Sequence, residues 1–216
     1  MFGFLKELPL LNEGAFSAGP TRFSFFAISL LFSSMAFGQA IYDGSVCKWN
    51  VNGWETRVGG GRGVNIAVSR DGHVAVANKG GGISTWDGKI WSPINEGLVK
   101  DLTYSGDGTL WVIGRDDDGG GNGSVCKYDG STWAPPKVGG GAGVRISGAE
   151  GSVVYVANAA GGIFKWTDNR WNEIPGGKAR DIAATTDGVL WVIGMDDMGG
   201  GNSSVCRYEG GEWTTR

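Results

Sequence analysis

Two glycine-rich acidic stretches carry the residue types and the spacing best suited to chemistry. The stretch "RDDDGGGNGSVCKY" at 115–128 recurs as "MDDMGGGNSSVCRY" at 195–208. Acids at alternate positions before a glycine turn are typical of calcium loops, in which about six to eight oxygens surround the ion. Asp116 and Asp118 have this spacing, but Met198 takes the place of Asp118 in the second stretch. Calcium, held by Asp116 and Asp118, therefore stands as one interpretation beside a solvated hairpin tip and a direct contact with another ligand.

The sequence offers little for other kinds of site. A phosphate-binding loop would need Lys followed by Ser or Thr after the glycines, and then a helix, and neither follows here. His73 is the single histidine, so a nucleophilic dyad or triad would have to be built around it. Catalysis would also break the symmetry between the two copies, and the sequence shows no such break. We therefore expect a protein that is not an enzyme.

The three cysteines occupy equivalent places. Cys47, Cys126 and Cys206 each lie in a near-copy of one segment, 79 and 80 residues apart. An odd number excludes complete pairing within the chain, and well-separated positions do not permit disulfides. We expect a small buried strand residue at each position and no zinc site.

The spacing of five tryptophans shows that the acidic stretches belong to a repeat. Trp54, Trp91, Trp133, Trp171 and Trp213 are 37, 42, 38 and 42 residues apart. The unit is therefore about 40 residues long, and short and long units alternate to give a super-repeat of about 80 residues. Both acidic stretches fall in long units.

Each unit contains four short apolar runs separated by turn residues. In the long unit at 98–138, Asp107-Gly108 and Asp129-Gly130 separate runs rich in β-branched and aromatic residues, and Asp-Gly in that position is a strong hairpin signal. The run "TLWVIG" is apolar at successive positions, as in a strand buried on both faces. The pattern predicts an all-β fold, a β-propeller of four-stranded antiparallel blades that cover one another.

The repeat also sets the expected domain organisation. We predict one propeller domain at 41–216 with about four and a half blades: a half-blade at 44–58 and blades at 62–95, 98–138, 142–174 and 178–216. The half-blade matches the last two strands of a long unit and has no matching first half in this sequence. Ring closure then requires a longer protein, an unusual closure, or a homo-oligomer that closes or caps the propeller, because an open ring exposes unpaired strand edges.

The first forty residues differ from the repeats. The segment at 23–38 is uncharged and mostly apolar, follows Arg22, and ends in small residues, with Gly38 and Ala40 at the −3 and −1 positions of a cleavage site. Such a segment is shorter than the roughly 20 residues of a membrane span and is typical of a secretory signal peptide. We expect 1–40 to be an N-terminal extension with this signal, and the mature chain to be secreted or extracytoplasmic without a membrane span. An uncleaved anchor is the alternative.

Composition narrows the partners. The net charge of −3 over 216 residues gives no basic surface, so a nucleic-acid partner is not expected. The 41 glycines would indicate low complexity if they were aperiodic. Ten tryptophans argue instead for a packed fold, because disordered chains are poor in aromatic residues.

The units resemble a known repeat. "IAVSRDGHVAVANKGGGISTWDGKIWSPI" and "DLTYSGDGTLWVIG…SVCKYDGSTW" are similar to the tectonin repeat over 44–216. The resemblance implies a six-bladed propeller, usually a lectin that binds cell-surface glycans. This sequence departs from that pattern in its number of blades and in the long acidic loop of alternate units.

One rim of the predicted propeller gathers polar groups. The loop between the second and third strands of a blade lies on the same rim as the link to the next blade, and loops on a rigid scaffold concentrate binding residues. We therefore predict ligand-binding residues at ten positions, six in the loops and four in the links: Asp116, Asp117, Asn122, Asp196, Asp197 and Asn202, and Arg62, Lys100, Arg145 and Arg180.

Two functions of different class stay open. The first, implied by the resemblance, is a secreted lectin-like propeller that recognises glycans or glycoconjugates through the repeated rim loops, with no cofactor other than the calcium considered above. Two copies of a weak site would gain avidity on a multivalent surface. The second is an extracytoplasmic protein-interaction or sensor propeller, or a fragment of a larger surface protein.

Overall fold

The computed structural model describes residues 44–94, 97–134 and 137–215, all of which belong to one compact unit. The predicted N-terminal extension, with its apolar segment at 23–38, lies outside the described residues. Strands make up nearly all of the regular structure there, as predicted, with two single-turn 3-10 segments. Among the described residues, no helix is long and apolar enough to cross a membrane.

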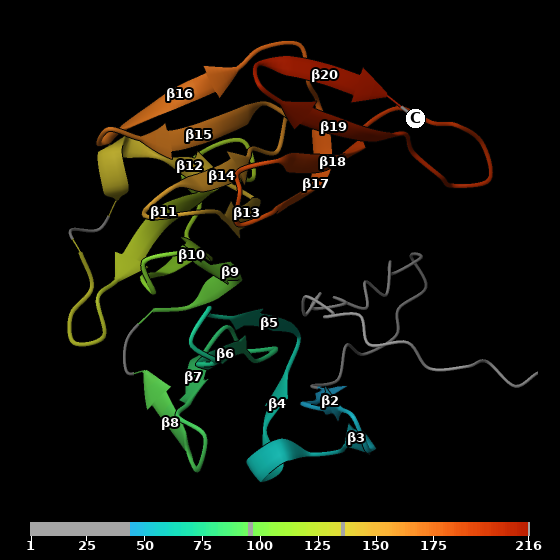
Figure 1. Cartoon of the computed structure of the whole chain (residues 1–216). Coiled ribbons are helices and arrows are strands. Elements are labelled where there is room, and N and C mark those ends of the chain that lie inside the picture. The colour runs from blue at the N-terminus through green and yellow to red at the C-terminus, as the bar shows by residue number, and fades with distance from the viewer. Residues whose placement is uncertain (1–43, 95–96, 135–136, 216) are drawn as a thin grey trace, which may run out of the picture. The chain divides into compact units, whose positions relative to one another are not determined.

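Four-stranded antiparallel sheets follow one another in chain order (Figure 1). Blade 1 consists of β5 (Asn65–Val68), β6 (Val74–Ala77), β7 (Ile83–Trp86) and β8 (Trp91–Ile94). Blade 2 consists of β9 (Val99–Tyr104), β10 (Leu110–Gly114) and β11 (Gly123–Tyr128), and a bridge between Tyr128 and Trp133 continues its outer hairpin. Blade 3 consists of β13 (Arg145–Gly148), β14 (Val154–Ala157), β15 (Ile163–Thr167) and β16 (Arg170–Ile174). Blade 4 consists of β17 (Ala179–Ala184), β18 (Leu190–Gly194), β19 (Val205–Glu209) and β20 (Glu212–Thr215).

A two-stranded hairpin precedes blade 1. It consists of β2 (Lys48–Asn50) and β3 (Gly53–Glu55), and just before it β1 (Gly44–Ser45) pairs with β4 (Arg62–Gly63). The equivalent pairing before blade 3 joins β12 (Ala142–Gly143) to the start of β11 in blade 2. The hairpin therefore holds the place of the outer half of a long blade, and the described residues give it no inner strands.

The first hairpin of a blade is fixed by a hydroxyl residue two positions before its Asp-Gly turn, which the turn signal alone does not indicate. The Ser105 hydroxyl donates to Asp107 Oδ1 at 2.6 Å, and the Trp111 indole N–H donates to the same hydroxyl at 3.0 Å. The Asp-Gly turn is thus tied to both the strand before it and the strand after it. The side-chain bond recurs in blades 1 and 4, where Ser69 pairs with Asp71 and Thr185 with Asp187.

The core lies between consecutive blades. Every residue of β10 except its last is buried, which confirms the expectation of a strand covered on both faces. One face of β10 packs on blade 1 and the other on blade 3. The apolar residues that meet across the two interfaces are Leu102, Leu110 and Val112 with Ala75, Ala77 and Ile83, and Trp111, Ile113 and Val125 with Ile146, Val154 and Val156. A third cluster joins blades 3 and 4.

Glycine runs before the short blades have a packing role. In η1 (Val58–Gly60) and η2 (Val138–Gly140) the first carbonyl accepts a hydrogen bond from a tryptophan N–H, Trp91 to Val58 O at 2.8 Å and Trp171 to Val138 O at 2.9 Å. Gly59 has φ +54°, and a Cβ there would lie 2.3 Å from the Trp86 ring. Only glycine fits a left-handed position pressed against an indole.

The cysteine expectation is wrong in part. None of the three forms a disulfide, and Cys126 and Cys206 are half-buried in β11 and β19. Cys47, however, is exposed and lies outside a strand. The environment of Cys47 differs because no described inner strands cover the β2–β3 hairpin, which begins directly after it.

Blades 2 and 4 offer a matched test of interblade packing. Trp111 is 1% exposed between blades 2 and 3, whereas Trp191, its equivalent in blade 4, is only half-buried. Trp111→Ala should lower the free energy of unfolding by about 3–5 kcal/mol, the usual cost of deleting a buried large aromatic side chain. Trp191→Ala should cost clearly less, because fewer atoms surround it. Urea unfolding followed by circular dichroism measures both, and equal losses would contradict the interface described here.

Candidate functional site

The first acid of each long loop braces the loop. Asp116 accepts from the Ser124 backbone N–H at 3.1 Å and from its hydroxyl at 2.5 Å. Asp196 accepts from the same two groups of Ser204 at 3.1 and 2.8 Å. In both, the serine hydroxyl bond is the main reason that the pKa of the carboxyl lies below its ordinary value. Both acids are therefore ionised at neutral pH.

The other predicted loop residues also make local bonds. Asp117 and Asp197 accept from the N–H two residues on, at 3.0 and 2.8 Å. Asn122 donates to Gly119 O at 2.9 Å and accepts from Ala159 N at 2.8 Å, which ties the loop to blade 3. The Asn202 side chain makes the equivalent of the first bond, because it donates to Gly199 O at 3.3 Å.

The predicted basic residues do not gather around one point. Lys100 donates to Gly121 O at 3.3 Å and so lies against the first long loop. Arg180 adds to the lowering of the Asp196 pKa and so lies near the second. Arg145 is on the innermost strand of blade 3, with its Nε 3.5 Å from Asp181 Oδ1. Arg62 lies in β4, exposed.

The calcium interpretation gains nothing from the geometry. Asp116 is engaged by Ser124, and Asp118 forms an ion pair with Lys137. Within the described ranges, no group of three or more His, Cys, Asp or Glu residues is arranged to hold a metal ion. A calcium site would have to be completed by backbone oxygens.

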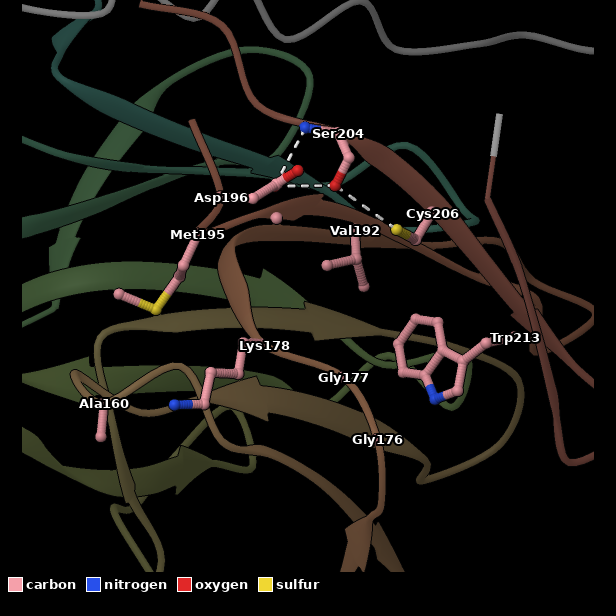
Figure 2. A pocket seen from close by; sticks show the side chains of 11 residues that line it. Ala160, Gly176, Gly177, Lys178, Val192, Met195, Asp196, Ser204, Cys206 and Trp213 are labelled. Carbon is pink, nitrogen blue, oxygen red and sulfur yellow. Dashed lines mark hydrogen bonds between the residues drawn. The ribbon is translucent and has the colours of Figure 1, made fainter. Parts of the chain in front are cut away.

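A hollow on blade 4 is lined by one of the predicted ligand-binding residues, Asp196, and by residues that were not predicted (Figure 2). It encloses about 520 Å³ where the second long loop meets the link from blade 3. Its lining includes the indole of Trp213, the amine of Lys178 and several apolar side chains. It also includes the Asp196 carboxylate, which is linked through the Ser204 hydroxyl to the Cys206 thiol. The residues are Ala160, Gly176, Gly177, Lys178, Val192, Gly194, Met195, Asp196, Ser204, Cys206 and Trp213.

The polar groups of the hollow are fixed by hydrogen bonds. Ser204 Oγ lies 2.8 Å from Asp196 and 3.7 Å from Cys206 Sγ, and Figure 2 shows the three side chains in one line. The Trp213 N–H donates to Pro175 O at 2.8 Å, which orients the indole beside Gly176 and Gly177. Of these residues, only Asp196 is among the predicted ligand-binding positions. Trp213 stood out in the sequence only as a marker of the repeat, and no sequence signal pointed to Lys178.

The equivalent place on blade 2 is built differently, although every position is offset by 80 residues. Leu98 stands where blade 4 has Lys178, and Arg115 where it has Met195. The Arg115 guanidinium donates to Lys79 O at 2.6 Å and to Val99 O at 3.1 Å. It joins the loop between β6 and β7 of blade 1 to the start of β9 in blade 2, so the two long blades present different chemistry at one rim.

A second polar row runs along the innermost strands. Equivalent register positions in blades 1 to 4 hold Asn65, Asp101, Arg145 and Asp181, which pair with Ala77, Ile113, Ala157 and Ile193 near the end of the second strand. Each of the first three reaches the next blade. Asn65 donates to Lys100 O at 2.5 Å, and Asp101 accepts from Ile146 N at 3.0 Å. Burial is the main reason that the pKa of Asp101 is raised to about 6.

The comparisons with known proteins concern the fold. No family model matches the chain, and no curated protein matches it. A gluconolactonase from Xanthomonas campestris has a TM-score of 0.53 at 15% identity over 80% of this chain and 68% of its own. A second putative gluconolactonase has 0.52 at 13% over 79% and 69%. YCF48 bound to D1 peptide has 0.50 at 19% over 72% of this chain and about half of its own, 54%. These likenesses support a β-propeller, and they do not single out the tectonin repeat.

The expectation that the chain is not an enzyme is overturned by these neighbours. Two of them are named as gluconolactonases, so proteins with a propeller fold include enzymes as well as binding proteins. At 13% and 15% identity the likeness shows the fold alone.

The raised pKa of Asp101 predicts a pH effect on stability. Because the folded state binds the proton more tightly than the unfolded state, whose reference value is 3.8, the free energy of unfolding should fall as the pH rises from about 4 to about 6. Asp101→Asn keeps an acceptor for Ile146 N and should remove that part of the slope. Urea midpoints measured at several pH values test this, and an unchanged slope in the variant would refute it.

Proposed function

We propose that the chain is a carbohydrate-binding β-propeller that recognises glycans through its rim, with the hollow on blade 4 as the principal site. The observation that supports this most is the side-by-side placement of the Trp213 indole, the Asp196–Ser204 pair and the Lys178 amine in one hollow. Propeller neighbours agree with the scaffold.

The chemistry of a sugar matches these groups. The C–H face of a pyranose ring packs on an indole, and its hydroxyls need fixed donors and acceptors around the rim of the hollow. Asp196, held ionised by Ser204, supplies acceptor oxygens that do not have to reorganise. Lys178 supplies a donor from the opposite chain segment. Met195 and Val192 add apolar contact.

The first long loop supplies a weaker second site in this proposal. Asp116 and Ser124 repeat the braced pair of blade 4, but Arg115 replaces Met195 beside it. Two unlike sites on one rim favour a branched or multivalent ligand, because the second contact is then intramolecular. Export by the apolar segment at 23–38 would bring such a rim to a cell surface, and that localisation belongs to the proposal.

A protein-interaction propeller is the second candidate. The outer face of blade 4 favours this candidate, because Val205 there is 45% exposed, whereas its equivalent in blade 2, Val125, is 0% exposed. Such a protein would bind without any dependence on sugars, and variants in the hollow would leave its binding unchanged.

The test uses substitutions that the chain itself tolerates at equivalent positions. Lys178→Leu and Met195→Arg convert the hollow of blade 4 to the residues of blade 2, Leu98 and Arg115. We expect glycans selected on an array to bind wild type and to lose about tenfold in affinity with either variant, about 1.4 kcal/mol. Tryptophan fluorescence titration measures the affinity.

A substitution away from both long loops is the control. Ile90→Lys alters an exposed residue between β7 and β8 and should leave the affinity within about twofold. Titration repeated with a chelator tests calcium, and product analysis with sugar lactones tests turnover. Absence of glycan binding by folded protein would contradict the proposal and favour the protein-interaction candidate.

A further inference from the structure

The two ends of the run of blades expose surfaces that are buried elsewhere in the same chain. On blade 4, Val205 is 45% exposed, whereas its equivalent in blade 2, Val125, is 0% exposed. On blade 1, Ile66 is 46% exposed, whereas its equivalent in blade 3, Ile146, is 5% exposed. Val125 and Ile146 lie in one cluster, at the interface of blades 2 and 3. The two exposed faces are thus the two halves of an interface that the chain already contains.

The hydrogen-bonding groups of the two faces also correspond. At the interface of blades 2 and 3, the inner edge of β13 donates from Ile146 N to Asp101 at 3.0 Å and from Gly148 N to Thr103 at 2.9 Å. The same positions on β5 are Ile66 and Val68, and among the described residues neither amide has a side-chain acceptor of this kind. Blade 4 presents Asp181 at the position of Asp101.

The aromatic contacts correspond as well. The rings of Trp111 and Trp166 lie 6.0 Å apart across the interface of blades 2 and 3. Their equivalents, Trp191 on blade 4 and Trp86 on blade 1, are both only half-buried. Arg207 stacks over Trp191 at 5.9 Å, as Lys127 does over Trp111 at 5.8 Å. The exposed face of blade 4 is therefore already arranged as the buried face of blade 2 is.

We propose that the outer face of blade 4 docks onto the inner edge of blade 1 in a second copy of this chain, in the arrangement by which blade 2 packs on blade 3. The contact pairs Trp191 and Val205 of one copy with Trp86 and Ile66 of the next, and Asp181 accepts from Ile66 N. Because the two faces differ, the contact is heterologous, and a pair of copies keeps one free face of each kind, blade 1 on one copy and blade 4 on the other. The occupant is a copy of this chain because the chain itself supplies both complementary surfaces.

The hairpin β2–β3 must yield in this arrangement. Val46 holds the place of Val125 beside blade 1, with its N–H donating to Gly61 O at 2.9 Å, as that of Val125 does to Gly141 O. The hairpin is weakly held, since Trp49 and Trp54 are 58% and 62% exposed. The segment "SSVCRYEGGEW" at 203–213 follows the same pattern as "GSVCKWNVNGW" at 44–54. The β19–β20 hairpin of the docking copy therefore replaces β2–β3 on the same partners.

Charge substitutions on each face test the proposal separately. Val205→Lys and Ile66→Lys each place an unpaired charge in the contact. Because a buried charge without a partner is strongly destabilising, each variant should weaken self-association by about a hundredfold or more. Sedimentation velocity over a concentration series measures this. Ile90→Lys, at an exposed apolar residue of a hairpin tip on neither face, is the control and should associate like wild type.

A mixture of the two variants distinguishes head-to-tail docking from other contacts. Val205→Lys protein retains a normal blade 1, and Ile66→Lys protein retains a normal blade 4, so the mixture should form a dimer that cannot grow further. A monomeric wild type at every concentration would overturn the proposal. So would undiminished association of either variant alone, or a mixture that stays monomeric. Circular dichroism checks that the variants fold, and Ile193→Lys with Val68→Lys serves as a second pair on the same two faces.

Discussion

Each blade in this chain is apolar on both faces, and it is stable only where a neighbouring blade covers each face. Blade 2 shows the satisfied case, because the alternate residues of β10 pack on blade 1 and on blade 3 and all but the last are buried. At about 25 cal/mol per Å² of apolar surface, contacts of this kind dominate the free energy of folding. Stability is therefore a property of blade pairs, as in other repeat architectures.

The inner edges of the blades add a second, directional constraint. An edge strand presents unpaired amides, and here side chains from the preceding blade bind them. Asp101 and Thr103 accept from β13, and Ser147 accepts from Ala184 N on β17 at 2.8 Å. These bonds set the register of one blade against the next. One of these bonds also stabilises the buried Asp101 carboxylate, because the Ile146 N–H that it accepts from partly compensates the cost of its burial.

The repeat could be predicted from the sequence because its signals are local. Asp-Gly turns, successive apolar residues in "TLWVIG" and the spacing of the tryptophans each depend on neighbours in the chain, and they give sheets of the predicted kind. The hollow on blade 4 could not be predicted in the same way. Trp213 has the sequence pattern of a core residue, and its ring lines the hollow only because Pro175 O orients it and glycines stand opposite. The acids of the long loops were selected as ligands because they are polar, and the structure shows that Asp116 and Asp196 first brace their own loops.

Repetition does not exclude catalysis, for a physical reason. Equivalent residues of a repeat have equivalent environments only if their neighbours are also equivalent. Asp101 lies between two blades, where burial raises its pKa to about 6. Asp181 has the same register position on blade 4, where its Oδ1 lies 3.5 Å from Arg145 Nε and no described blade lies beyond it. Position within the run of blades thus gives identical residues different neighbours. A propeller can acquire a site at one blade without any visible break in its sequence repeat, and the fold alone does not decide between binding and catalysis.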